Sequence, residues 1–473
     1  MTATDTTPLT APDRVEHDLL GERLLPHGAY YGVHTLRAME NFPITGTPLA
    51  RHPGLVAALA RVKQAAALAN ADLRLLHPDL AAVISTACEE IADGKLHEQF
   101  TVDVIQGGAG TSSNMNANEV IANRALELLG HPKGSYEHLH PIEDVNRGQS
   151  TNDVYPTAVK IALAFGVARL NGALAELQTA LAAKGAEFAD VLKVGRTQLQ
   201  DAVPMTVGQE FTAFAHTLGK DHRRLADTAG LLHEINLGGT AIGTGLNAHP
   251  HYPGTACRHL ARLTGLPLTT ADDLIEATSD TGAFVQLSGA LKSLAVKLSK
   301  ICNDLRLLAS GPQAGLGELN LPRMQAGSSI MPGKVNPVIP EVVNQIAFEV
   351  IGSDTTVTLA AEGGQLQLNA FEPVIAHCLL KSLDRLTAGC QTLARRCING
   401  ITVNAAHLTR QTEENVGIVT ALNNVIGYEA ATALARQALT SRRSIRDLLL
   451  DSGRLTPAEI DALLTPARLT TPQ

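Results

Sequence analysis

Apolar residues recur at alternating spacings of four and three along three stretches of the chain. This spacing places the side chains on one face of a helix, as in the seam of a coiled coil. At 1.5 Å per residue, a helix of about 25 residues spans on the order of 35–40 Å. The pattern therefore predicts an elongated bundle of long helices. The seams consist of Leu287, Leu291, Leu294, Leu298, Ile301, Leu305 and Leu308; of Leu163, Val167, Leu170, Leu174, Leu177 and Leu181; and, with gaps, of Phe211, Phe214, Leu218, Leu225 and Leu232.

The regularity of the pattern divides the chain into three expected domains. Before residue 150 the periodicity is broken by recurring Gly, Pro, Asn and Asp, which predicts an N-terminal α-rich domain over residues 1–150. Residues 1–14 are polar, rich in Pro and Thr and without an apolar core, so we expect a flexible tail and not a secretory signal. The long-helix bundle occupies residues 151–400. A small helical C-terminal domain follows over residues 401–473.

The C-terminal domain carries one sharp helix start signal. The sequence TPAE at 456–459 has the form of a capping box, in which Thr456 and Glu459 satisfy each other's backbone amides. Pro457 stands at the first helical position, where its missing N–H is not needed. The sequence predicts a short helix from Pro457 to Leu464.

Composition supports a large, mainly α protein. A chain of 473 residues has room for about three domains. Aromatic residues make up only 3% and tryptophan is absent, so the core must consist of Leu, Val, Ile and Ala, which suits helices. No uninterrupted apolar run of about 18 residues occurs, so no membrane span is expected.

The net charge and the positions of cysteine and histidine argue against nucleic-acid binding, membrane binding and metal binding. The net charge of −8 comes without a basic block, so neither nucleic acid nor an anionic membrane is an expected partner. The six cysteines are scattered and form no CxxC pair, which predicts free thiols in a reducing cytoplasm. His138 and His140 lack a third ligand nearby, so no metal site is predicted.

Four segments place hydroxyl and amide side chains beside glycines. They are GGAGTSSNMN at 107–116, GQSTND at 148–153, GRTQLQDAVP at 195–204 and GSSIMPGKVNP at 327–337. Each segment alone is typical of a turn or a helix N-cap. Together they indicate a site that holds carboxylates with neutral donors and one lysine.

Two nucleotide-binding motifs do not fit these segments. A phosphate-binding P-loop needs four residues between its glycines and a hydroxyl after its lysine, whereas five residues separate Gly327 from Gly333 and Val335 follows Lys334. The glycine-rich sequence NLGGTAIGTGLN at 236–247 lacks the G-x-G-x-x-G spacing, and we expect no strand before it.

The loop at 327–337 resembles the signature of the aspartase/fumarase superfamily, and the other segments match that family over almost the whole chain. FTVDVIQGGAGTSSNMN, NLGGTAIGTGLN and AAEGGQLQLN are similar to the branch that eliminates ammonia from L-aspartate to give fumarate. Fumarases typically have GSGTQ in place of GAGTS. The resemblance implies a mainly α, three-domain fold whose central helices form a twenty-helix core in a homotetramer. It also implies active sites shared between subunits, a small-molecule substrate and no cofactor.

The resemblance further implies roles for ten residues. Ser328 would be the base, acting as an alkoxide on a loop that closes over the substrate. A serine anion must be favoured by loop amides and nearby positive charge. The substrate-binding residues would be Thr111, Ser150, Thr151 and Ser329 for the side-chain carboxylate, Lys334 and Asn336 for the α-carboxylate, and Asn152, Thr197 and Gln198, with Thr111, for the amino group.

Two positions bear on the alternatives. Gln198 stands where fumarases and some aspartases have histidine, and a glutamine, which cannot give up a proton, suits ammonia better than hydroxide as the leaving group. Asp144 replaces a histidine common among relatives, so any accessory role of that histidine is in doubt. A class II fumarase and a catalytically silent, crystallin-like scaffold are the alternative functions. The intact Ser328, Lys334 and Asn336 argue against the scaffold.

Overall fold

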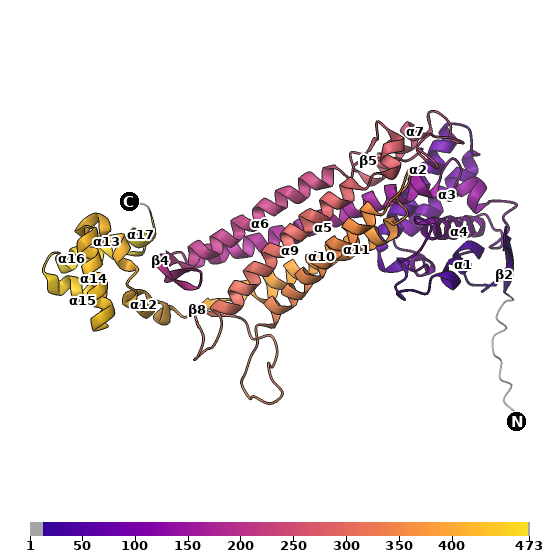
Figure 1. Ribbon diagram of the computed structural model, residues 1–473. Helices are drawn as coiled ribbons and strands as arrows, with labels where there is room; N and C mark the ends of the chain where they lie inside the picture. The colour runs from indigo at the N-terminus through magenta and orange to yellow at the C-terminus, as the bar shows by residue number, and fades with distance from the viewer. Residues whose placement is uncertain (1–12, 472–473) are drawn as a thin grey trace, which may run out of the picture. The chain divides into compact units, whose positions relative to one another are not determined.

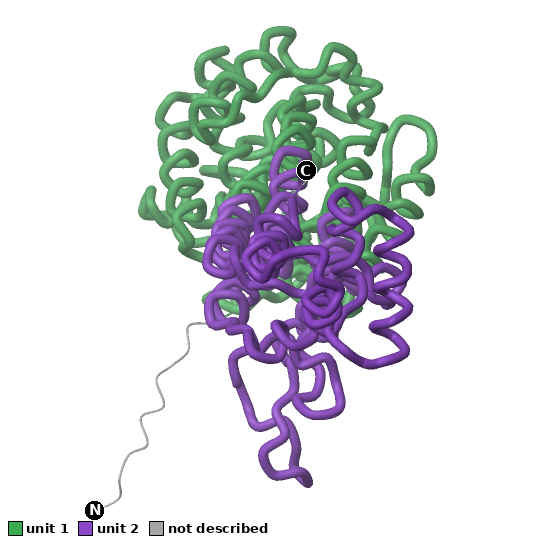
Figure 2. Tube along the Cα trace, turned by 90° about the vertical axis from the view of Figure 1, so that its left-hand side faces the viewer, with its two compact units in different colours: residues 1–169, 225–292, 350–384 green, residues 170–224, 293–349, 385–473 purple. Residues whose placement is uncertain are grey.

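The computed structural model describes residues 13–471, so residues 1–12 of the expected tail lie outside it. The chain forms two compact units, drawn in green and purple in Figure 2. Unit 1 contains the chain up to Arg169 together with Leu225–Lys292 and Val350–Asp384. Unit 2 contains Leu170–Arg224, Ser293–Glu349 and the chain from Arg385 onward. The three-domain division remains a prediction.

Five long helices dominate the chain and contribute residues to both units (Figure 1). The two regular seams are confirmed, because all their members are buried in α5 and α9. The third seam lies in α6, except that Leu232 follows the end of that helix. The bounds are α5 Thr151–Glu187, α6 Val207–Gly230, α9 Gly282–Leu308, α10 Val338–Glu362 and α11 Glu372–Arg396.

Buried polar contacts fix the neighbours of these helices within each unit. In unit 1, Asp354 of α10 accepts hydrogen bonds from Ser288 and Lys292 of α9 at 2.8 and 2.5 Å. In unit 2, the amide of Asn344 on α10 donates to Ser299 Oγ on α9 at 2.8 Å. Because an unpaired buried polar group is unfavourable, these contacts fix the register of two helices whose apolar seams alone would allow sliding.

Of the described residues, α5 is the one helix long and apolar enough to cross a membrane by length and composition. Two thirds of its most apolar window, 67%, is buried inside the structure. A core helix with that much of its surface packed against other helices passes the same test.

Unit 1 adds shorter helices and two small sheets to its parts of the bundle. Helix α2 packs against α3, α4 and α7. The strand β5, which pairs in parallel with β6, comes directly before residues 236–247, so the expectation of no strand there was wrong. The elements are β1 Arg14–Asp18, β2 Gly21–Leu25, α1 Val33–Asn41, α2 Pro53–Asp72, α3 Pro78–Ala92, α4 Thr111–Leu128, β5 Glu234–Ile235, α7 Tyr252–Thr264, β6 Thr269–Thr270 and α8 Leu274–Ser279, with 3₁₀ turns at Leu49–Arg51 and His97–Gln99 and a π-helical turn at Pro141–Val145.

Helix α4 is buried although many of its residues are polar. Its Glu119 is 1% exposed and accepts backbone N–H groups from Gly32, His34 and Thr35 at 2.8–3.1 Å. Burial raises the pKa of this carboxyl to about 7 in spite of those donors. Glu119 thereby joins α4 to the start of α1, a contact that apolar periodicity does not predict.

Unit 2 ends in a cluster of short helices with its own apolar core. The capping box at Thr456 is confirmed, and its helix ends at Leu463, one residue earlier than predicted. Ile418, Leu422, Ile445 and Leu448 belong to this core. The elements are β3 Leu192–Thr197, β4 Gln200–Thr206, β7 Leu319–Asn320, β8 Thr402–Val403, α12 Ala405–Glu414, α13 Ile418–Ile426, α14 Tyr428–Ser441, α15 Ile445–Ser452, α16 Pro457–Leu463 and α17 Pro466–Thr470, with a 3₁₀ turn at Ile398–Gly400.

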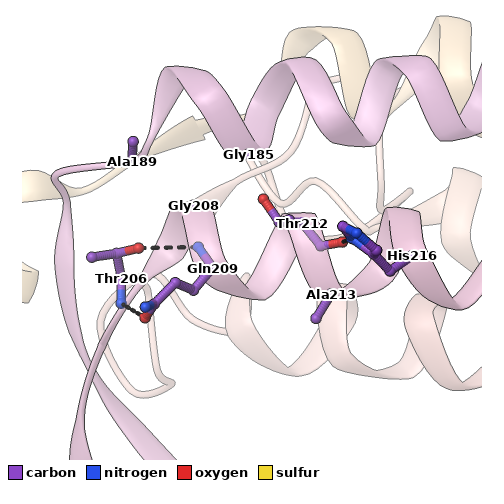
Figure 3. Close-up of a pocket in the computed structure, with 8 residues that line it drawn as sticks. All are labelled: Gly185, Ala189, Thr206, Gly208, Gln209, Thr212, Ala213 and His216. Carbon is purple, nitrogen blue, oxygen red and sulfur yellow. Dashed lines mark hydrogen bonds between the residues drawn. The ribbon is translucent and has the colours of Figure 1, made fainter. Parts of the chain in front are cut away.

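The end of α5 and the start of α6 approach each other through glycines (Figure 3). A Cβ at Gly208 would lie 2.4 Å from Gly185 O and 2.7 Å from Ala189 Cα, so only glycine fits. Thr206 and Gln209 cap α6 by exchanging two hydrogen bonds of 3.0 Å. The hollow of about 400 Å³ beside this crossing contains none of the predicted site residues, so we assign the crossing a structural role.

Gly208→Ala should lower the free energy of unfolding by about 1–3 kcal/mol, because the added methyl group meets backbone atoms that cannot rotate away. Thermal and denaturant unfolding would measure the change. Gly172→Ala, also in a helix of unit 2, is the matched control, since no atom lies within 4 Å of its added Cβ. Equal stability of the two variants would contradict the close approach.

Candidate active site

Four of the predicted residues lie in unit 1 at the N-terminal ends of two helices. Thr111 begins α4, Thr151 begins α5, and Ser150 and Asn152 flank Thr151. The turn before α4 can approach α5 only because Gly110 lacks a side chain: a Cβ there would lie 2.5 Å from the ring of Tyr155. The φ angle of Gly110, +91°, also favours glycine. The backbone N–H groups at a helix start suit the binding of an anion.

Hydrogen bonds orient the side chains of this group. Asn114 donates to Thr151 Oγ1 at 3.0 Å, which leaves the Thr151 hydroxyl proton available to donate to a ligand. The amide nitrogen of Asn152 donates to Ala241 O at 2.7 Å, so its carbonyl oxygen is the atom left to face a ligand. A carboxylate needs donors and an ammonium group needs acceptors, and the two side chains supply one of each.

Asp153 fixes the backbone that carries this group of side chains. Its buried carboxylate accepts the N–H groups of Ser150 at 3.0 Å, Gly238 at 2.9 Å and Thr240 at 3.0 Å. It thus joins the start of α5 to the glycine-rich loop 236–247. Burial raises the pKa of Asp153 to about 6, while the three N–H donors oppose that rise.

Thr197 and Gln198 lie at the tip of the hairpin formed by β3 and β4 in unit 2. Thr197 pairs with Gln200 across a two-residue turn. Both turn residues have positive φ, +53° for Gln198 and +63° for Leu199, where the tightest hairpins usually have Asn-Gly. Residues other than glycine are strained in this conformation. Contacts in the rest of the hairpin must therefore hold its tip in place.

Buried ion pairs hold the base of that hairpin. Glu318, fully buried, pairs with Arg196 and with Lys193 at 2.9 Å, and Lys193 also pairs with Glu210 at 2.7 Å. Gln198 opens onto a hollow of about 310 Å³ that is also lined by Lys193, Arg196 and Glu210. The ion pairs fix the orientation of the hairpin, because breaking one would leave a buried charge without its partner.

The loop 327–337, also in unit 2, closes on itself. Gly327 N–H donates to Lys334 O at 2.9 Å, and Asn336 Nδ2 donates to Gly327 O at 2.7 Å. Ser328 Oγ accepts the N–H groups of Ile330 at 3.2 Å and Met331 at 2.9 Å. Two N–H donors on one hydroxyl oxygen stabilise negative charge on that oxygen.

The remaining loop residues differ in their availability. Ser329 and Lys334 are exposed, and within residues 13–471 the Lys334 ammonium group forms no hydrogen bond or ion pair. The amide nitrogen of Asn336 donates one N–H to Gly327 O, so its second N–H remains as a donor for a carboxylate. The structure thus assembles the ten predicted residues as three groups, one in unit 1 and two in unit 2.

The described residues contain no group of three or more His, Cys, Asp or Glu that could hold a metal ion. All six cysteines are free and buried. The polar residues Asn114, Asn146, Asp153 and Glu318 support the predicted site residues but were not predicted. Their signal in the sequence is weak, since only the run of polar residues in GTSSNMN suggests a buried polar helix.

Comparisons with known proteins identify the family of the chain. A family model described as "Lyase" matches residues 21–352, and one described as "Fumarase C C-terminus" matches residues 418–471. The chain is 58% identical to an aspartate ammonia-lyase of Pseudomonas fluorescens, over 97% of this chain and 96% of that protein. The chain belongs to the aspartase/fumarase superfamily. An aspartate ammonia-lyase of Escherichia coli strain K12 is 53% identical, over 97% of this chain and 96% of that protein.

Solved structures of superfamily members have the same fold. A fumarate lyase:delta crystallin from Brucella melitensis bound to cobalt superimposes with a TM-score of 0.94 at 55% identity, covering 97% of this chain and 100% of that one. A class II fumarase from Schistosoma mansoni superimposes with a TM-score of 0.90 at 33% identity, covering 98% and 100%. The mainly α aspartase/fumarase fold expected from the sequence is confirmed.

Asn336→Ala should loosen the loop 327–337. It removes a hydrogen bond worth roughly 1 kcal/mol, so amide exchange in this loop should accelerate about fivefold. Hydrogen exchange read by mass spectrometry on peptides covering 327–336 would measure the effect. Asn320→Ala is the control, because Asn320 bonds to Asn404 and not to the loop. Unchanged exchange in Asn336→Ala would contradict the closing role of this amide.

Proposed function

We infer that this chain is an aspartate ammonia-lyase, a carbon–nitrogen lyase that converts L-aspartate to fumarate and ammonia. The reaction class is supported by one observation above all, the Ser328 hydroxyl oxygen that accepts two loop N–H groups. The substrate is supported by relatives 53–58% identical over nearly the full length, whose names are aspartate ammonia-lyase.

The difficult step is removal of a proton from the carbon next to the side-chain carboxylate. That carbon becomes acidic only when the charge spreads onto the carboxylate oxygens as an aci-carboxylate, so donors aimed at those oxygens provide the main stabilisation. Ser150, Thr151 and Ser329 supply hydroxyl donors, and Thr111, whose hydroxyl donates to Gly108 O at 2.7 Å, joins them when that bond is exchanged for the substrate. The orientation of the Thr151 hydroxyl by Asn114 is the contact that prepares one of them.

Ser328 acts as the base. A serine hydroxyl is ordinarily far too weak an acid to lose its proton near neutral pH, so its anion must be stabilised by the protein. The N–H groups of Ile330 and Met331 already point at its oxygen, and the same loop carries the ammonium group of Lys334, which has no partner among residues 13–471. Both features favour the alkoxide over the alcohol.

The α-carboxylate and the amino group of the substrate bind to different residues. Lys334 and Asn336 bind the α-carboxylate. The carbonyl oxygen of Asn152 faces the amino group, with Thr111, Thr197 and Gln198 beside it. When the C–N bond breaks, its electron pair stays on nitrogen and the ammonium group leaves as neutral ammonia, so the site needs no acid there.

The three separate groups of residues are explained by a homotetramer whose active sites are shared between subunits. Large apolar side chains remain exposed on the long helices of the single chain, including Val296 of α9 at 51%, Phe348 of α10 at 61% and Leu359 of α10 at 65%. Burying them against the helices of other subunits in a twenty-helix core removes this surface from water. The cytoplasmic location remains a prediction.

Fumarase is the second candidate function, and two observations disfavour it. The solved class II fumarase is 33% identical, well below the aspartate ammonia-lyases. Gln198 cannot protonate a departing hydroxide.

Purified protein offered L-aspartate should release fumarate and ammonia in equal amounts, while L-malate stays unchanged. Ultraviolet absorbance of fumarate and an independent ammonia assay measure the two products. Turnover of malate alone would make the protein a fumarase. Inactivity on both substrates would support the silent scaffold.

Ser328→Ala should reduce kcat by on the order of a thousandfold, because the base is lost. Size-exclusion chromatography should show an unchanged oligomer, since Ser328 lies on a loop and not in a helix seam. Ser441→Ala, at the exposed end of α14, is the control and should keep full activity. A Ser328→Ala variant with near wild-type kcat would rule out this serine as the base.

A further inference from the structure

Lys63 is a buried lysine that the mechanism above does not use. It lies in the middle of α2 and is 0% exposed. Its Nζ donates to Asn146 Oδ1 at 2.7 Å and to Gln149 Oε1 at 2.9 Å. Both acceptors are neutral amides in the segment that leads directly to Ser150 and Thr151.

No anion contacts this ammonium group within the described part of the chain. Asp153 is a carboxylate that stabilises its charge, but its oxygens already accept three backbone N–H groups. The other titratable group that acts on its charge, Cys88 of α3, is buried, and burial raises the pKa of that thiol well above its ordinary value. A buried cation with neutral partners is unfavourable unless a further charge balances it.

The contacts of Lys63 lead to the carboxylate-binding group. Asn146 Oδ1 also accepts from Asn114 Nδ2 at 3.3 Å and from Asn118 Nδ2 at 3.2 Å. Asn114 then donates to Thr151 Oγ1 at 3.0 Å. Asn146 Oδ1 is thus the shared acceptor that links the Lys63 ammonium group to the Asn114 amide, and that amide in turn orients the Thr151 hydroxyl.

We propose that Lys63 is a positioning residue whose buried ammonium group fixes Asn146 and Gln149 and supplies the positive charge that favours a carboxylate at Ser150 and Thr151. The inference rests on the proposed function in one respect, that these two residues bind a carboxylate. The bound carboxylate is then the anion that balances Lys63. Lys63 itself does not touch the substrate.

This arrangement makes carboxylate binding depend on pH. Burial lowers the pKa of Lys63 to about 7, opposed by Asp153. Below that pH the group is charged before the ligand arrives. Above it, binding of a dianion must draw a proton onto Lys63, so affinity falls as the pH rises. By reciprocity, the factor by which the charge strengthens binding equals the factor by which the ligand strengthens proton binding.

The experiment measures binding of succinate, a dicarboxylate without an amino group, to the full-length protein by isothermal titration calorimetry. In the wild type, Kd should rise on going from about pH 6.5 to about pH 8.5, with proton uptake at the higher pH, read from the dependence of the heat on the buffer. Lys63→Met, which keeps length but removes charge, should bind about tenfold more weakly at pH 6.5 and lose this pH dependence.

Lys160→Met is the matched control. Lys160 is also a lysine of unit 1 that is buried, at 8% exposed, and donates to a neutral group, Glu234 O at 2.7 Å, but it has no contact with Asn146 or Gln149. Burial lowers its pKa as well. Its replacement should leave the succinate Kd and its pH dependence unchanged. This control separates loss of the Lys63 charge from loss of any buried lysine.

Three results would overturn the inference: wild-type binding without proton uptake at about pH 8.5, a Lys63→Met variant with the wild-type pH dependence, or equal weakening in Lys160→Met. If Lys63→Met does not fold, the wild-type proton uptake alone decides. Aspartate turnover by the same wild-type preparation keeps the two proposals apart, because turnover with any of these results removes only the role of Lys63. Absence of both turnover and succinate binding would overturn the proposed function as well.

Discussion

The carboxylate of Asp153 is the contact on which the unit 1 part of the site depends. A fully buried carboxylate is stable only when its oxygens are satisfied, and here three backbone N–H groups from two distant parts of the chain satisfy them. The start of α5 and the loop 236–247 must therefore adopt their observed conformations together. This requirement also fixes the positions of the Ser150 and Thr151 hydroxyls and of the Asn152 amide, because all three lie at the start of α5.

The same principle recurs in both units with different partners. Glu119 accepts three N–H groups at the start of α1, and Glu318 pairs with Arg196 and Lys193 below the strained hairpin tip. In each case a buried carboxylate fixes irregular backbone that carries no apolar pattern of its own. Long helices with apolar seams form the scaffold, and these buried charges set the geometry of the loops at the helix ends.

Neutral donors and few cations suit the reaction. The aspartate ammonia-lyase substrate carries two carboxylates, and the transition state places additional charge on one of them. Hydroxyl and amide donors held in fixed directions stabilise that charge without binding the ground state as strongly as a cluster of arginines would. The site has few positive charges. One is on Lys334 of the loop and, by our inference, a second is on the buried Lys63, which does not touch the substrate.

The sequence by itself determined the helical scaffold, the seams of α5 and α9, the capping box at Thr456 and the family. Those features are local or periodic, so each is written in a few consecutive residues. Its resemblance to the family also located ten candidate residues. It did not identify the contacts that hold those residues in position. Only the tertiary structure placed Asn114 against Thr151 and paired β5 with β6 before the loop 236–247. Lys63 and Asn146 are 83 residues apart in the chain, and the hydrogen bond between them forms because α2 packs against α4 and against the π-helical turn Pro141–Val145, which ends just before Asn146. Long-range pairing of buried polar groups depends on where the helices meet, and no local pattern records that.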